Sequence, residues 1–269
     1  MYLARYTKRF IPEFDAECRM ESRIVSSKSA SVSPLDNRFF GVFALVITVV
    51  VFGGFALNWT NNPNNIARIS LWTGLHGAMS AAWYVLLLNQ IRLSAVGNYA
   101  NHKTIGTLSV ILVIGILITG PVMAVEFYQR MAGFGVFGVD DAQARLRAGS
   151  FLGGAFLQWT LFVVLYVLGV LSVKQPAHHK RFMIAAAIQM MPEGLNRAVH
   201  LLALPGYSMF VIMFMVYATL MMYDWKTTRR LYGSTLLSFT LFCLLALAMR
   251  TVFKWQAWAD WIVPVIHGQ

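Results

Sequence analysis

Four histidines are placed along the chain as two pairs of possible metal ligands. His76 and His200 each lie inside an apolar stretch, at expected depths of about 9 Å and about 6 Å from the same membrane surface, at a helical rise of about 1.5 Å per residue. His102 and His179 stand at the starts of two other apolar stretches, near the opposite surface. Imidazole nitrogens bind haem iron and other transition metals. The matched levels predict haem b or a non-haem metal at His76/His200 and at His102/His179; the alternatives are hydrogen bonds between helices and snorkelling towards headgroups.

Two charged residues within one apolar stretch are the other chemical candidates. Glu193 and Arg197 lie one helical turn apart, so an ion pair between them would lower the cost of placing both charges in a membrane. Beside a cofactor, Arg197 would balance the charge of a haem propionate or substrate, and Glu193 would orient a ligand or pass a proton. These two residues are therefore the candidate catalytic pair, with a structural lock between helices as the alternative. Glu126 and Arg130 repeat the spacing, and for them the structural role is favoured.

The composition requires these residues to lie in a membrane. Hydrophobic residues make up 58% of the 269 residues and charged residues only 12%, with a mean hydropathy of +0.59, which excludes an ordinary soluble domain. One membrane-spanning helix needs about 20 apolar residues. The sequence therefore predicts an all-α, polytopic membrane protein with seven transmembrane helices, at about 39–58, 70–92, 104–128, 151–173, 182–203, 206–224 and 235–254.

Charge and polarity divide the chain into three parts. Residues 1–38 form a polar tail, residues 39–254 the membrane domain with its core at 70–203, and residues 255–269 a tryptophan-rich external segment typical of an interfacial helix. Lys and Arg gather in the tail and in alternate turns, which predicts a bacterial inner (plasma) membrane protein with a cytoplasmic N-terminus and an external C-terminus. The net charge of +11 is then explained by topology and by attraction to the lipid bilayer, with no nucleic acid as partner.

A two-helix pattern occurs twice in the predicted core. Trp83 precedes the turn Ala100-Asn101-His102-Lys103, and Trp159 precedes the turn Ala177-His178-His179-Lys180. Two hairpins that run in the same direction predict a four-helix core, and such cores hold cofactors between facing helices. The chain has no Cys-x-x-Cys-His motif and no cluster of cysteines, so covalently attached haem and iron–sulfur clusters are excluded. Its few intramembrane carboxylates exclude a hydrolase of the paired-carboxylate type.

Residues 70–203 resemble the transmembrane di-haem cytochrome b family, whose members move electrons across membranes. The resemblance lies in Leu75-His76-Gly77-Ala78-Met79 followed by Trp83, and in His102 with Gly106. It implies two haems, each held by a pair of histidines. The family places these histidines within helices, whereas His102 and His179 are expected at helix starts.

A second stretch resembles an uncharacterised bacterial family of multi-pass membrane proteins. It comprises His179-Lys180-Arg181-Phe182-Met183 and the later Asn196-Arg197. This resemblance implies a multi-pass membrane protein and no particular activity.

Three functional hypotheses follow from the residues. The first is an inner-membrane redox protein that binds haem b or another metal through paired histidines, with transmembrane electron transfer and quinone as a possible partner. The second is a transporter of a small molecule or ion that uses Glu193 and Arg197 at the kinks expected at Pro121 and Pro192. The third is an accessory subunit of a larger membrane complex.

Overall fold

The computed structural model describes residues 34–64 and 69–268, and these residues form helices joined by short turns. Most of the predicted polar tail, residues 1–33, lies outside the described residues. The helices, in chain order, are α2 (Pro34–Asn61), α3 (Leu71–Ala95), α4 (Tyr99–Gly133), α5 (Ala142–Leu171), α6 (Pro176–Met190), α7 (Pro192–Leu201), α8 (Ser208–Thr228), α9 (Gly233–Arg250), the 3₁₀ turn η2 (Val252–Lys254) and α10 (Gln256–His267).

Six helices of the described part are long and apolar enough to cross a membrane, namely α2, α3, α4, α5, α8 and α9. Each of these helices carries exposed apolar side chains, such as Val42 and Val49 on α2 and Ile111 and Ile118 on α4. Exposed apolar surface is expected where acyl chains replace water as the solvent. The all-helical, multi-pass part of the prediction is therefore confirmed.

The predicted fifth span, in which a kink is expected at Pro192, is divided at that proline into the separate helices α6 and α7. Pro192 has no N–H with which to bond the carbonyl of Ile188, and the N–H of Met191 donates to that carbonyl instead, at 3.1 Å. The carbonyl of Ala187 is left without its helical donor and accepts a hydrogen bond from the Tyr84 hydroxyl at 2.8 Å. A buried carbonyl needs such a partner, because water and lipid cannot supply one.

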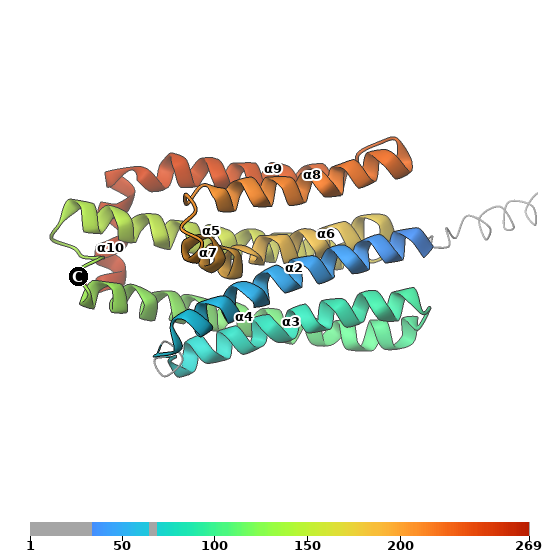
Figure 1. Cartoon of the computed structure of the whole chain (residues 1–269), viewed down its shortest axis with the longest axis horizontal. Coiled ribbons are helices and arrows are strands. Elements are labelled where there is room, and N and C mark those ends of the chain that lie inside the picture. Colours follow the sequence, from blue (N-terminus) through green and yellow to red (C-terminus); the bar gives the residue numbers. More distant parts are fainter. Residues whose placement is uncertain (1–33, 65–68, 269) are drawn as a thin grey trace, which may run out of the picture. The chain divides into compact units, whose positions relative to one another are not determined.

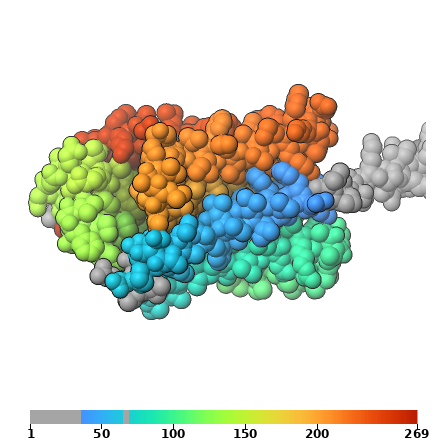
Figure 2. Space-filling view, viewed as in Figure 1, coloured from blue at the N-terminus to red at the C-terminus, as the bar shows by residue number. Residues whose placement is uncertain are grey.

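Helices α3 to α6, called the core below, pack as successive neighbours. α4 packs against α3 and α5, and α5 packs against α6 (Figure 1). α8 and α9 pack against each other, and α9 also packs against α5 and α6. In the space-filling view α2 crosses the molecule between α3 and α8 (Figure 2).

A buried ion pair joins α6 to α8 and α9. The Arg181 and Asp224 side chains are 2% and 0% exposed, and Arg181 Nε donates to Asp224 Oδ1 at 3.0 Å and to Oδ2 at 3.2 Å. Thr235 of α9 donates its hydroxyl to Asp224 Oδ2 at 2.6 Å. The guanidinium also lies over the Tyr232 ring, at 3.7 Å from its centroid. The charges are thus fully paired by three helices, as a buried charge requires.

We predict that Asp224→Asn lowers the free energy of unfolding by about 3–5 kcal/mol, because it leaves the Arg181 charge buried without its partner. The double variant Arg181→Met/Asp224→Leu should recover most of that loss, since it removes both charges. Denaturation midpoints in detergent measure the effect, with Asp260→Asn, in an exposed ion pair, as the control. Equal midpoints for Asp224→Asn and the control would contradict the prediction.

Two glycines let α2 and α7 touch through their backbones. A Cβ on Gly54 would overlap the carbonyl of Gly194, and a Cβ on Gly194 would overlap the backbone of Val51. Small residues commonly allow such close helix crossings in membranes. The crossing fixes α7 against α2 and brings the Arg197 guanidinium over the Phe55 ring, at 4.2 Å from its centroid.

The crossing can be tested with neighbouring glycines of the same helix. Gly54→Ala should lower the unfolding free energy by about 1–3 kcal/mol, because backbone atoms cannot move aside as a flexible side chain can. Gly53→Ala is the matched control, since nothing lies within 4 Å of a Cβ at that position. Thermal unfolding in detergent compares the two variants, and similar melting temperatures would show that the helices do not cross there.

The C-terminal helix α10 packs mainly against α5. The indole N–H of Trp258 donates to the carbonyl of Gly149 at 2.8 Å, and Arg145 Nε donates to Asp260 Oδ1 at 2.6 Å. Hydrogen bonds from Gln256 and Arg145 hold the pKa of the Asp260 carboxyl below its ordinary value. The connection between α4 and α5 is shorter than the predicted spans 104–128 and 151–173 leave for it, because α4 extends to Gly133 and α5 begins at Ala142.

Acid should loosen α10. The pKa of Asp260 is lower in the folded protein than in the unfolded chain, where it is about 3.9. The contribution of the Asp260 carboxylate to folded-state stability is therefore complete above the unfolded pKa and is lost as the pH falls towards the folded pKa. Hydrogen exchange of residues 256–267, corrected for intrinsic rates, should therefore accelerate slightly below about pH 4. Asp260→Asn should lack this acid step, and the same step in the variant would contradict the assignment.

Candidate functional site

His102 and His179 lie close together, at the starts of two different helices. His102 lies in the first turn of α4 and His179 in the first turn of α6, and their ring centroids are 6.3 Å apart with an interplanar angle of 71°. Both side chains are partly buried. The structure thus brings together the two members of this predicted pair.

The two imidazoles are held in the same way. His102 Nδ1 bonds the carbonyl oxygen of Gln90 at 3.1 Å, and His179 Nδ1 bonds the carbonyl oxygen of Gly169 at 2.8 Å. A carbonyl oxygen can only accept, so each Nδ1 carries a proton and donates it. In the neutral rings both Nε2 atoms then carry lone pairs, and neither has a hydrogen-bond partner among the described residues. This is the arrangement in which a histidine usually binds a metal.

Flexible and unpaired side chains surround the pair. The Gln90 side chain is 8% exposed, and neither of its amide atoms has a partner among the described residues. Gly106, one turn beyond His102, leaves the space beside that amide open to it, with the nearest amide atom 3.7 Å from a Cβ position. The thioether of Met183 lies beside Gly169 in the same manner. The atoms nearest to a Cβ at each glycine therefore belong to a flexible side chain, that of Gln90 at Gly106 and that of Met183 at Gly169.

The neighbouring histidine of the same turn has a different role. His178 Nδ1 hydrogen-bonds the hydroxyl of Ser234 at 3.0 Å, and its ring lies edge-on to Tyr232 at 5.7 Å. It therefore points to α9 and away from His102. His178 offers a control for any experiment on His179.

The second predicted pair is not joined by any described contact. His76 is buried, its Nδ1 lies 3.1 Å from the hydroxyl of Thr119, and its ring is 6.2 Å from Trp159. His200 is exposed near the end of α7. His200 thus lies on α7, beyond the break at Pro192, whereas His76 lies on α3.

Glu193 and Arg197 form the intrahelical pair that their spacing predicts, although it is loose. Arg197 Nη1 lies 3.8 Å from Glu193 Oε2, and the side chains are 37% and 43% exposed. Gln158 of α5 donates to Glu193 Oε1 at 3.4 Å. The Glu193 carboxylate also interacts electrostatically with His76. These residues make a polar cluster at the α7 level, away from the helix starts that hold His102 and His179.

His102 and His179 together can supply two ligands to a metal. Within residues 34–64 and 69–268, no group of three or more His, Cys, Asp or Glu side chains is placed to hold a metal ion. The pair can therefore serve a metal that brings its other ligands with it, as haem iron does.

The chain matches no family model, no curated protein and no solved structure, so its function must be argued from the site itself.

Proposed function

We propose that this chain is a membrane redox protein that binds one b-type haem between His102 and His179. The observation that carries the proposal is the pair of neighbouring imidazoles, each with its Nδ1 proton bonded to a backbone carbonyl and its Nε2 lone pair without a partner among the described residues. Metal–nitrogen bonds are about 2 Å long, and the ring centroids are 6.3 Å apart, so one metal ion would be within reach of both rings.

A haem suits this pair better than a bare metal ion does. His102 and His179 would hold the haem iron as its two protein ligands, and the porphyrin would supply the remaining ligands. Ligands from facing helices are also the usual way in which four-helix cores hold cofactors. When bound, the haem supplies one-electron chemistry, and the protein supplies its orientation and surroundings.

The chain's own residues would act as supports. The carbonyls of Gln90 and Gly169 keep the rings oriented, and the side chains of Gln90 and Met183 would move to admit the macrocycle beside Gly106 and Gly169. The Gln90 amide, which has no partner among the described residues, would then find one on the cofactor.

The proposed site lies near the cytoplasmic face of a bacterial inner membrane. Lys103 and Lys180 follow His102 and His179 near the starts of α4 and α6, and the α8–α9 turn, on the same side by chain topology, carries Arg229 and Arg230. Basic turns stay on the cytoplasmic side. In this topology α6 and α7 together complete a seventh crossing.

The spectrum of the purified protein tests the proposal. After expression with ample haem, we expect a Soret band and about one haem per chain, with a shift of the band on reduction. His102→Ala and His179→Ala should each lose the haem, and external imidazole should restore part of the band by replacing the missing ring. His178→Ala and His200→Ala are the matched controls and should keep the haem.

Two results would contradict the proposal. One is the absence of haem from the wild-type protein despite ample supply. The other is full haem content in both His102→Ala and His179→Ala, which would place the iron elsewhere.

A further inference from the structure

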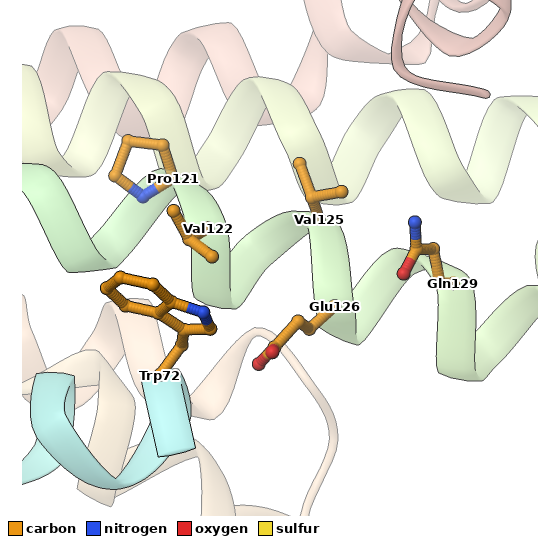
Figure 3. A pocket seen from close by; sticks show the side chains of 6 residues that line it. All are labelled: Trp72, Pro121, Val122, Val125, Glu126 and Gln129. Atoms are coloured by element: carbon orange, nitrogen blue, oxygen red, sulfur yellow. The ribbon is translucent and has the colours of Figure 1, made fainter. Parts of the chain in front are cut away.

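A groove opens at the other end of the core, between the first turn of α3 and the second half of α4. Its volume is about 440 Å³, within the usual range for ligand sites. The lining residues are Trp72 from α3 and Pro121, Val122, Val125, Glu126 and Gln129 from α4. Figure 3 shows the Trp72 ring beneath Pro121 and Val122 and the Glu126 carboxylate on the same side.

The Glu126 carboxylate is held by hydrogen bonds to only one of its two oxygens. Its Oε2 accepts hydrogen bonds from the hydroxyls of Ser70 and of Thr73, the latter at 3.3 Å. Ser70 also caps α3 by accepting from the Thr73 N–H at 3.1 Å. No described residue donates to Oε1, although each carboxylate oxygen can accept more than one hydrogen bond. The groove therefore ends in a fixed carboxylate whose Oε1 accepts no hydrogen bond from the described residues.

The groove lies at the level of a membrane interface. Glu126 is about 10 Å from the end of α4 at Gly133, at about 1.5 Å per residue. Trp72 is 41% exposed, as is usual for an indole among lipid headgroups. The groove is lined by α3 and α4, two helices that are long and apolar enough to cross a membrane. A carboxylate close to the apolar part of a membrane is costly unless hydrogen-bond donors or a cation meet it.

We propose that the groove binds a phospholipid with a primary ammonium headgroup, of the phosphatidylethanolamine type. The ammonium donates to Glu126 Oε1 and lies against the Trp72 ring, where a cation is attracted by the face of the indole. One acyl chain lies along Pro121, Val122 and Val125. A quaternary ammonium has no N–H to donate, and an anionic headgroup is repelled by the carboxylate, so the site discriminates against both.

Lipid retention by the full-length protein tests this proposal. The protein is reconstituted in vesicles of equal parts phosphatidylethanolamine, phosphatidylcholine and phosphatidylglycerol, purified in mild detergent, and analysed for bound lipid by mass spectrometry. We expect phosphatidylethanolamine to be enriched, and Glu126→Gln to reduce its enrichment about tenfold, as the loss of one charge-assisted hydrogen bond implies. Trp72→Ala should reduce it less.

Controls separate this site from the rest of the molecule. Glu126→Gln keeps an acceptor for Ser70 and Thr73, so the cap of α3 should remain and the haem content should not change. Asp260→Asn removes a carboxylate outside the groove and should leave lipid retention unaltered. Equal retention of the three lipids, enrichment of phosphatidylglycerol, or no effect of Glu126→Gln would overturn the proposal without touching the haem assignment.

Discussion

The ion pair between Arg181 and Asp224 is the contact on which the arrangement of α6 depends. A charged pair that is almost wholly buried cannot slide or turn without breaking, because no water or lipid would replace the lost partner. Arg181 lies two positions after His179, so the contact that fixes α6 against α8 and α9 also fixes the direction in which His179 leaves the helix. The Nδ1–carbonyl bond to Gly169 then sets the ring itself. The geometry of the candidate site therefore follows from a charge interaction outside it.

The same helix shows how the need for hydrogen bonds shapes the other half of the core. Pro192 ends the regular pattern, and the carbonyl freed at Ala187 is taken by the Tyr84 hydroxyl. Beyond the break, α7 can approach α2 closely because Gly54 and Gly194 meet there. The polar side chains Glu193 and Arg197 are consequently half exposed at the edge of the bundle, whereas His102 and His179 meet inside it. One end of the core thus carries a half-exposed carboxylate–guanidinium pair, and the other end carries two neighbouring imidazoles.

Local sequence patterns predicted what depends on local properties. Hydropathy over about 20 residues predicted seven spans, and six helices of the described part are long and apolar enough to cross a membrane. His102 and His179, which were predicted as a pair, lie with their ring centroids 6.3 Å apart. The partnership of Arg181 with Asp224 was not predicted, because Arg181 reads as one of several basic turn residues and Asp224 as the end of a span. The proline in the fifth predicted span was expected to kink the helix, yet it breaks it. Beyond the proline His200 is exposed, and the aromatic neighbour of His76 is Trp159 and not His200.

His102 and His179 are proposed to hold one haem iron between them. Electron paramagnetic resonance of the oxidised, haem-loaded protein tests it directly. We predict a low-spin ferric signal of the kind given by two imidazole ligands, replaced by a high-spin signal or lost in His102→Ala and in His179→Ala. A low-spin signal that persists in both variants would contradict the account.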